Sequence, residues 1–247
     1  MKQFLLLISS VLFWTWFLIS SVVLTPPLII VWALTVPFDR RRSVLHKLSC
    51  FWGAQYFWAN PLWRSQITGK EKFDDRYPWI VISNHQSLVD IMVIYGLFKR
   101  FRWTSKAENF KVPFVGWVLS FNRSIRVYRA SRDAYRRFRN QAVAVLEMGT
   151  PIMIFPEGTR SGDGQLGRFK QGAFMLAHET HTGIIPMVLD GSYKAIRKKG
   201  WRLTGFARIQ LKILDPVPYD EFKDLSTAET TAKFRKIIDD ELQALRS

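Results

Sequence analysis

The chain opens with a long run of apolar positions. No charged residue occurs between positions 3 and 38, and a Pro-Pro pair at 26–27 interrupts the run. As a helix, residues 3–25 would be about 34 Å long, enough to cross the hydrocarbon core of a bilayer, whereas residues 28–38 would reach only about 16 Å. Two arrangements fit this pattern. One is a single spanning helix that continues, bent at the prolines, towards the interface, and the other is a hairpin that enters one leaflet and returns.

The apolar run ends abruptly at an arginine cluster, "DRRR" (39–42). Arginines that flank an apolar segment mark the cytoplasmic side of a membrane. The apolar region is too long for a cleavable signal peptide, and no A-x-A site follows it. We therefore expect residues 1–44 to anchor the protein in a membrane, with a cell inner membrane as the expected location. Residues 45–247 should form the folded domain on the cytoplasmic face.

The hydrophobic pattern of this domain changes along the chain. Residues 45–63 are typical of an interfacial or packed helix that ends near Pro61, and beyond about residue 66 short apolar runs alternate with amphipathic stretches. The short runs predict strands at 79–83, 101–105, 125–128, 151–155, 183–189 and 207–214. The longer stretches predict helices at 88–99, 114–121, 131–148, 172–180 and 226–246. Strands that alternate with helices indicate an α/β fold with a mostly parallel sheet flanked by helices.

Three polar segments directly follow three of the predicted strands. They are "NHQSLVD" (84–90), "RAS" (129–131) and "PEGTRSGDG" (156–164). In a parallel sheet the ligand site lies beyond the carboxyl ends of the strands, so all three segments should meet at one rim. The sequence therefore predicts a single site built from these loops.

His85 and Asp90 are the residues of the first loop that can perform chemistry. An imidazole whose orientation and tautomer are fixed by a carboxylate is a general base. No serine or cysteine is required as a nucleophile, so this base could act directly on a substrate hydroxyl. The alternative is that His85 caps the following helix and Asp90 satisfies its N-terminus. Spacing alone does not separate the two interpretations.

The third loop, "FPEGTRS" (155–161), brings together backbone N–H groups, a hydroxyl and a guanidinium. Glycine allows the backbone to approach a ligand closely, and arginine binds phosphate through two parallel hydrogen bonds. An ordinary glycine-rich turn with a solvated arginine is the alternative.

The charge of the chain points to an anionic partner. The formal net charge is +16, from 36 Lys and Arg against 20 Asp and Glu, which suits nucleic acid or a phospholipid surface. A nucleic-acid-binding protein would show a recognisable reader motif, and the sequence contains none. We therefore expect a phospholipid membrane and no nucleic acid as partner, and a membrane-tethered nucleic-acid-binding protein is the remote alternative.

One cysteine excludes an intramolecular disulfide, and four histidines without a ligand cluster give no reason to expect a metal.

Three blocks of the sequence together carry a family resemblance. They are His85-x4-Asp90, "FPEGTR" (155–160) and "IIPMVLDGS" (184–192). In this order and at these separations they resemble the PlsC-type glycerolipid acyltransferase family, in particular its 1-acyl-sn-glycerol-3-phosphate acyltransferases. The resemblance covers about residues 45–220 and makes 45–247 the expected acyltransferase domain.

Two further blocks match the family with substitutions. "KAENFKVPFVGW" (106–117) is similar to the family's Lys-x-Glu-Leu…Pro-x-x-Gly stretch, with Asn109 in place of the leucine. "SIRVYR" (124–129) stands where the family usually has Gly-x-Ile-x-Ile-Asp-Arg, with Ser124 for the glycine and Tyr128 for the aspartate. These departures leave the headgroup of the acceptor open, and lysophosphatidylglycerol and lyso-ornithine lipid are the alternatives.

The resemblance implies transfer of an acyl chain from acyl-CoA or acyl carrier protein to the free glycerol hydroxyl of lysophosphatidic acid, which gives phosphatidic acid. No cofactor is implied beyond the acyl donor, which is a co-substrate. His85 would take the proton of the hydroxyl, and Asp90 would hold the imidazole. Backbone N–H groups around Gly158 and Thr159 would stabilise the oxyanion.

The phosphate of the acceptor requires cations. By the same resemblance, Arg129 and Arg160, together with Lys106, would bind it. Glu157 would order the loop or bind a glycerol oxygen, and it is not expected to act as a second base.

Overall fold

The computed structural model describes residues 2–128, 133–198 and 200–247. Its strands are β1 (Trp63–Thr68), β2 (Ile80–Ser83), β3 (Arg102–Lys106), β4 (Ile125–Val127), β5 (Ile152–Ile154), β6 (Ile184–Asp190) and β7 (Ala207–Ile213). Its helices are α1 (Lys2–Thr35), α2 (Ser43–Trp58), α3 (Val89–Tyr95), α4 (Val115–Phe121), α5 (Ala134–Glu147), α6 (Gly172–Thr180) and α7 (Thr227–Ala244).

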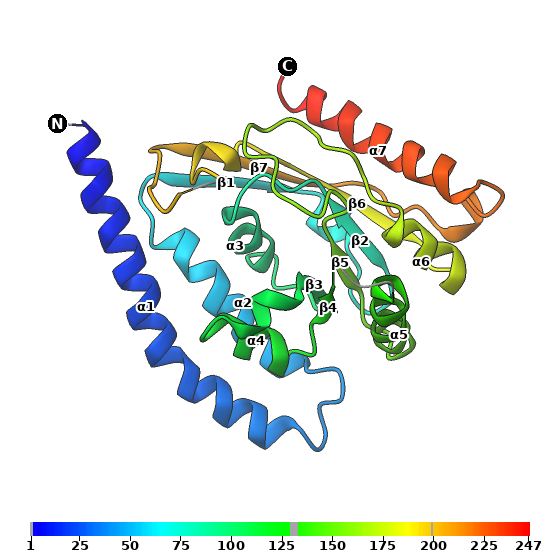
Figure 1. Ribbon diagram of the computed structural model, residues 1–247, viewed down its shortest axis with the longest axis horizontal. Helices are drawn as coiled ribbons and strands as arrows, with labels where there is room; N and C mark the ends of the chain where they lie inside the picture. Colours follow the sequence, from blue (N-terminus) through cyan, green and yellow to red (C-terminus); the bar gives the residue numbers. More distant parts are fainter. Residues whose placement is uncertain (1, 129–132, 199) are drawn as a thin grey trace.

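The strands form a seven-stranded sheet in the order β1-β7-β6-β2-β5-β3-β4. The strands from β6 to β4 in this order are parallel, β7 runs antiparallel to β6, and the edge strand β1 is parallel to β7. Helices α2, α3 and α4 cover one face, and α5, α6 and α7 cover the other (Figure 1). The expected α/β fold with a mostly parallel sheet is confirmed.

The central strand β2 shows why the apolar runs of the sequence become strands. All four of its residues are buried. Val81 points into the hydrophobic core beneath α2 and α3, while Ile80 and Ile82 belong to the core beneath α5, α6 and α7. A strand that is covered on both faces has no polar side, and a continuous apolar run is therefore its signature.

Helix α1 continues through Pro26 and Pro27, so the hairpin turn that the sequence allowed at the prolines is wrong. Both prolines lie on the exposed side of the helix, and each removes only one backbone donor. Thr25 and Leu28, on either side of them, are buried against the body, and the Thr25 hydroxyl donates to the Ser21 carbonyl at 2.6 Å. This packing stabilises the helix across the prolines. The chain reverses only after Thr35.

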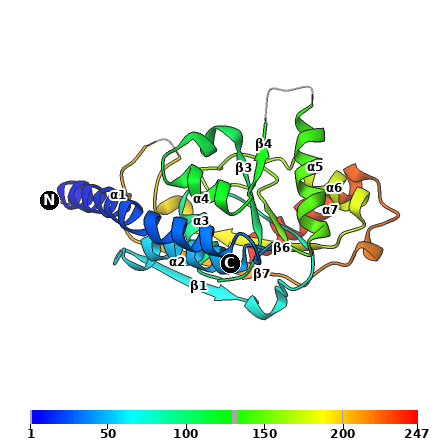
Figure 2. The same cartoon turned by 90° about the horizontal axis from the view of Figure 1, so that it is seen from below.

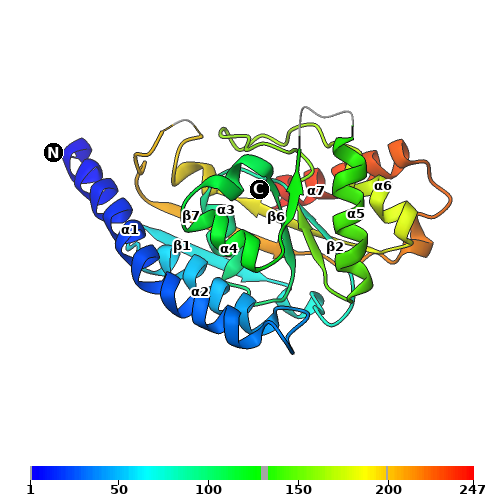
Figure 3. The same cartoon turned by 60° about the horizontal axis from the view of Figure 1, so that its bottom comes forward.

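After this reversal, α2 returns antiparallel along α1 (Figures 1 and 3). The Trp16 indole donates to the Gln55 side chain at 2.7 Å, and the Ser20 hydroxyl lies 3.1 Å from the Tyr56 hydroxyl. Near the other end of α1, Trp32 stacks on Phe121 of α4 with ring centroids 5.0 Å apart. The helix is thus packed on the body along most of its length, and only its first turns extend beyond the sheet (Figure 2).

The opposite face of α1 is apolar and exposed. The exposed side chains include those of Phe4, Leu5, Leu12, Leu18, Ile19, Val22, Val23, Ile30 and Leu34. By length and composition, the segment Gln3–Thr35 is sufficient to cross a membrane.

The end of the predicted 45–63 helix is wrong, and the edge strand β1 is missing from the sequence prediction. Helix α2 ends at Trp58, and the Asn60 side chain then accepts a hydrogen bond from the Leu62 amide at 2.9 Å in a turn. Trp63 begins β1, in which it is the only fully buried residue. An edge strand that faces solvent on most positions lacks the apolar run on which the prediction depends. The remaining expected strands lie within one or two residues of the observed ones.

Candidate active site

The loops that follow β2, β5 and β6 lie on one rim of the sheet. These three strands are parallel neighbours, so their carboxyl ends meet at the same edge. The segments 156–171, 191–198 and 200–206 gather along this edge, at the top of the view in Figure 3. The Ser161 amide donates to the His85 carbonyl at 2.8 Å, which joins the first and the third of the predicted loops directly.

His85 and Asp90 are in contact. His85 Nδ1 lies 2.8 Å from Asp90 Oδ2, and the same oxygen accepts the backbone amides of Gln86 at 2.6 Å and Ser87 at 2.9 Å. Asp90 is fully buried, whereas the His85 side chain keeps 14% of its surface exposed. Asp90 therefore satisfies the turn before α3 and contacts the imidazole at the same time, which combines the two interpretations that the spacing left open.

This contact fixes the tautomer of the imidazole. An ionised carboxylate can only accept hydrogen bonds, so the proton of neutral His85 lies on Nδ1. Nε2 then carries a lone pair, and it makes no hydrogen bond with any residue of the described ranges. A lone pair at the exposed end of the ring is what a general base needs.

Phe155 holds the plane of the imidazole. Its ring stacks on His85 with centroids 3.9 Å apart and an angle of 9° between the planes. Trp103 of β3 stacks in turn on Phe155, with centroids 5.8 Å apart. This contact was not expected from the sequence, although Phe155 is the last apolar residue before "PEGTR" and follows β5, the neighbour of β2.

Glu157 binds backbone and not the imidazole. Its side chain accepts the His85 amide through Oε1 at 2.8 Å and the Gly167 amide through Oε2 at 3.0 Å. Burial raises the pKa of this carboxyl, and the two amide donors oppose the shift. Glu157 thus connects the His85 turn to the far end of the 156–167 loop, as expected for a residue that orders the loop.

Gly158 and Thr159 were expected to donate backbone N–H groups to the oxyanion, and the turn after Glu157 already occupies one of these two amides. Gly158 has a φ of 67°, a conformation that favours glycine, and its amide donates to the Phe155 carbonyl at 2.9 Å. The exposed Thr159 makes no backbone-amide hydrogen bond within the described part of the chain. Arg160 donates from Nη2 to the Lys198 carbonyl at 3.2 Å.

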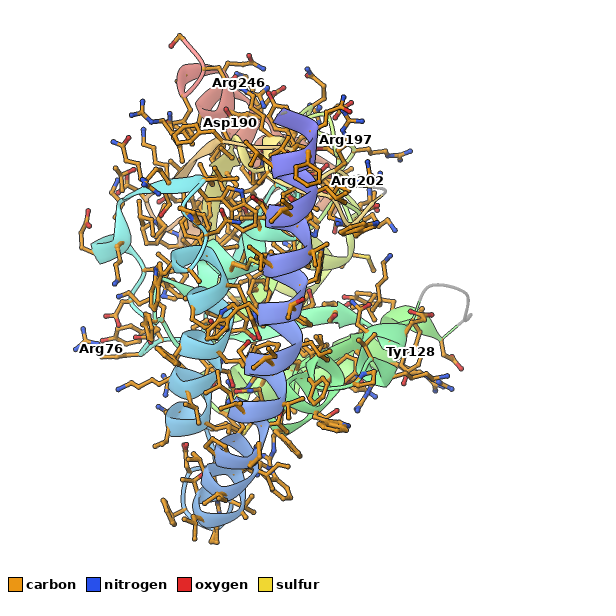
Figure 4. All side chains as sticks on the ribbon, turned by 90° about the vertical axis from the view of Figure 1, so that its left-hand side faces the viewer. Arg76, Tyr128, Asp190, Arg197, Arg202 and Arg246 are labelled. Carbon is orange, nitrogen blue, oxygen red and sulfur yellow. The ribbon has the colours of Figure 1, made fainter. Side chains whose placement is uncertain are left out.

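The other two predicted cations are Lys106 and Arg129. Lys106 is the exposed last residue of β3, and it lies on the same rim, two strands from the loop of His85. Arg129 lies outside the described residues. Tyr128, which stands for the family's aspartate, has the guanidinium of Arg137 over its ring at 5.3 Å, and it lies well away from the N-terminal half of α1 in Figure 4.

Asn84 and Gln86, the neighbours of His85, turn towards β6. The Asn84 side chain donates to the Leu189 carbonyl at 2.7 Å and accepts the Leu189 amide at 2.8 Å. The Gln86 amide group donates to the same carbonyl at 3.0 Å and to Asp190 Oδ1 at 3.2 Å. The alternation in "NHQ" could have indicated this, because side chains alternate between faces in an extended segment.

Arg246, which follows α7, completes this network. Its guanidinium donates to Asp190 Oδ1 from Nη2 at 2.6 Å and from Nε at 3.0 Å, and Nη2 also donates to the Gly164 carbonyl at 2.6 Å. Figure 4 shows Arg246 and Asp190 close together at one end of the molecule. Because Asp190 also binds Gln86, the arginine links the 156–167 loop to the turn that contains His85.

We expect Arg246→Ala to lower kcat/KM for the expected acyl transfer by about tenfold. The variant loses charge-assisted hydrogen bonds that fix the 156–167 loop and the turn that contains His85. Lys236→Ala, which removes an exposed cation paired with Asp240 on α7, is the matched control and should leave kcat/KM unchanged. Steady-state kinetics together with a thermal unfolding curve check this. Unchanged kcat/KM with a lower unfolding temperature would show that Arg246 stabilises the fold without positioning the site.

The chain is similar in sequence to known acyltransferases. The profile of the acyltransferase family matches residues 64–190. A 1-acyl-sn-glycerol-3-phosphate acyltransferase of Chlamydomonas reinhardtii is 30% identical over 188 residues, which are 75% of this chain and 56% of the relative. A chloroplastic 1-acyl-sn-glycerol-3-phosphate acyltransferase of Brassica napus is 29% identical over 87% of this chain and 62% of the relative. The chain thus spans little more than half the length of these curated relatives.

A solved structure covers the chain more completely. The crystal structure of PlsC from Thermotoga maritima, a 1-acyl-sn-glycerophosphate (LPA) acyltransferase, superposes with a TM-score of 0.84 at 26% sequence identity. The match covers 100% of this chain and 98% of the other. The likeness therefore includes α1 and α2 as well as the sheet.

Proposed function

The chain belongs to the acyltransferase family, and from this premise we propose that it transfers an acyl chain from a thioester donor to the free hydroxyl of lysophosphatidic acid, giving phosphatidic acid. The observation that carries the proposal is the contact between His85 Nδ1 and Asp90 Oδ2 at 2.8 Å, which leaves Nε2 as a base on the rim of the sheet. The names of the relatives and of the full-length structural match support the choice of acceptor.

In the proposed reaction, His85 Nε2 takes the proton of the acceptor hydroxyl as its oxygen attacks the thioester carbonyl. Asp90 stabilises the imidazolium that forms. The tetrahedral intermediate then collapses, the carbon–sulfur bond breaks, and the imidazolium returns the proton to the departing thiolate. The products are the new ester and a free thiol, and His85 is again neutral.

The negative charge on the carbonyl oxygen needs donors during this reaction. We assign this role to the Thr159 amide, because the Gly158 amide is already hydrogen-bonded to Phe155. In this proposal Gly158 provides the positive φ that the turn requires, and Glu157 holds the loop against the His85 turn. Arg160, Lys106 and Arg129 stay the proposed ligands of the acceptor phosphate.

The proposed partner of α1 is a phospholipid membrane. The inner side of the helix is packed on the body from Ser10 to Trp32, so the helix is not free to cross a bilayer on its own. We propose that the exposed apolar face lies in one leaflet, that residues 1–44 act as the anchor, and that the arginines at 40–42 stay on the cytoplasmic face, with a cell inner membrane as the location. Residues 45–247 form the proposed acyltransferase domain.

The direct test is an assay of the purified protein with labelled acyl-CoA and a panel of lysolipids. The proposal expects lysophosphatidic acid to be the best acceptor by kcat/KM. Faster acylation of lysophosphatidylglycerol or lyso-ornithine lipid would assign a different headgroup to the same reaction. Absence of transfer to every lysolipid, from acyl-CoA and from acyl carrier protein alike, would contradict the reaction itself.

Arg160→Lys tests the proposed phosphate contact. Lysine keeps the charge but loses the forked pair of N–H donors that suits a phosphate monoester. We expect the KM for lysophosphatidic acid to rise about tenfold, while the KM for the acyl donor changes little and a phosphodiester lysolipid is affected less. A change in the donor KM alone would show that Arg160 serves the thioester substrate.

A further inference from the structure

A basic pocket lies beside the His85 turn and has no role in the reaction as described above. It has a volume of about 770 Å³, within the range of small-molecule sites. Its walls are the loop after Arg160 and the segment that connects β6 to β7. The lining residues are Ser161, Gly162, Asp163, Tyr193, Lys194, Arg197, Lys198, Thr204 and Phe206.

The pocket is close to the reaction centre. The Ser161 amide, in one wall, donates to the His85 carbonyl. Arg160 reaches the opposite wall through its hydrogen bond to the Lys198 carbonyl. A ligand in the pocket would therefore lie next to the base, but it would contact different side chains.

The two walls approach each other at glycines. A Cβ atom at Gly162 would lie 2.7 Å from Lys198 Cβ, and one at Gly164 would lie 2.6 Å from the ring of Tyr193. Both glycines have positive φ, at 80° and 84°. Glycine is thus needed at both positions for the walls to come together.

The outer wall is also fixed to the rest of the protein. The Trp14 indole of α1 donates to the Trp201 carbonyl at 2.7 Å, and the Leu203 amide donates to the Ser10 hydroxyl at 2.9 Å. Figure 4 shows Arg197 and Arg202 beside the N-terminal half of α1. The pocket is therefore a built feature of the fold, held between α1 and the rim of the sheet.

The chemistry of the lining selects the ligand. Lys194, Arg197 and Lys198 are exposed, and none of them forms a salt bridge within the described ranges of the chain. Tyr193 and Phe206 also line the pocket, and Lys194 Nζ lies 5.4 Å from the centroid of the Tyr193 ring. Several phosphate groups next to a heteroaromatic base match such a lining, since cations bind phosphate and an exposed ring can stack on a base.

We propose that this pocket binds the nucleotide end of coenzyme A, with its pyrophosphate, its 3′-phosphate and its adenine. The inference rests on the proposed acyl transfer and identifies the donor. The acceptor phosphate does not fit this place, because in lysophosphatidic acid the phosphate is attached to the carbon next to the one that carries the reacting hydroxyl, and it must stay close to Nε2. In acyl-CoA the pantetheine arm separates the thioester from the phosphates, so they can reach a neighbouring pocket.

Acyl carrier protein, which is acidic, is the other acyl donor that a basic surface could bind. The two aromatic rings favour the nucleotide, because a protein helix could bind the exposed cations without them. The carrier protein is therefore an outcome of the test.

The test compares two double variants with the same change in net charge. Arg197→Glu with Lys198→Glu alters the pocket, and Lys223→Glu with Lys236→Glu alters exposed lysines outside it. We expect binding of adenosine 3′,5′-bisphosphate, measured by calorimetry on the detergent-solubilised protein, to weaken by about tenfold or more in the pocket variant only. The KM for palmitoyl-CoA should rise similarly, whereas the KM for S-palmitoyl-pantetheine, which lacks the nucleotide, should stay the same.

Several results would overturn the proposal. One is unchanged bisphosphate binding in the pocket variant, and another is an equal rise in KM for S-palmitoyl-pantetheine. A rise in KM only for acyl carrier protein would assign the surface to that protein instead. A wild-type protein that binds the bisphosphate but transfers no acyl chain would contradict the proposed function and leave the pocket proposal standing. Acyl transfer without bisphosphate binding would support the proposed function and contradict the pocket proposal.

Discussion

His85→Ala is expected to lower kcat for acyl transfer by about a thousandfold or more, since the variant lacks the only proposed proton acceptor. The fold should survive the change. Asp90 would still accept the amides of Gln86 and Ser87, so its buried carboxylate keeps two of its three donors. Membrane association should also be unchanged, because His85 lies on the rim and not on the exposed face of α1.

The matched control for this variant is His178→Ala. His178 is a remote histidine of α6, whose Nε2 lies 2.9 Å from the Thr230 hydroxyl. Transfer of labelled acyl chains to lysophosphatidic acid is the measurement, with thermal unfolding of each variant as the check on the fold. If the His85 variant retains substantial turnover while folded, the direct-base mechanism is wrong.

Asp90→Asn separates the charge of the carboxylate from its position. Asp90 Oδ2 accepts the Gln86 and Ser87 amides as well as His85 Nδ1, so asparagine keeps its carbonyl oxygen at this place and still holds the neutral ring. The neutral amide cannot stabilise the imidazolium that forms when Nε2 takes the proton of the hydroxyl. We expect a loss in kcat of about a hundredfold, smaller than that of His85→Ala.

The core of the site could be predicted from sequence because its determinants are local. His85 lies in the polar turn that follows a fully buried strand, and Asp90, five positions later, lies in the first turn of the short helix α3. Strand β2 has no polar face, so its apolar run is visible without knowledge of its neighbours. The catalytic roles of His85 and Asp90 stay predictions, but the contact between the two side chains is a property of the structure.

The remaining contacts depend on chain segments that only the fold brings together. Arg246 binds Asp190 across 56 positions of sequence, and Phe155 meets His85 only because β5 pairs with β2. No periodicity or local spacing indicates such partners. The same reason explains the missed strand β1, which depends on pairing with β7 and not on an apolar run of its own.

The sequence did not predict that α1 continues past the two prolines, and the reason is energetic. Two adjacent prolines predict a break when only the local cost in hydrogen bonds is considered. In the structure, buried residues on both sides of the prolines keep the helix on the body, and this tertiary packing outweighs the local preference. The sequence could not reveal that the inner side of an almost uniformly apolar helix has a packing partner.

Glutamate at four positions on the outer face of α1 should release the protein from membranes. Leu12, Ile19, Val23 and Ile30 form one stripe along the helix, and each is at least 51% exposed. Burial of one such side chain contributes on the order of 1.5–3 kcal/mol, so the loss of all four should lower the partition onto phospholipid vesicles by more than about a thousandfold. The unfolding temperature in detergent should change little, because the stripe faces away from the body.

This quadruple variant is a sharper test of the anchor than a deletion of residues 1–38. Phe13 and Leu28 of α1 are buried in the same hydrophobic core as Tyr56 and Trp63. A deletion would expose that core to water and cause aggregation, which itself produces a pellet on sedimentation. The double variant Lys223→Glu with Lys236→Glu matches the change of net charge and should stay bound to the vesicles. If the quadruple variant still sediments quantitatively with vesicles in high salt, the exposed face of α1 does not hold the protein on the membrane, and the arginine cluster or another surface must do so.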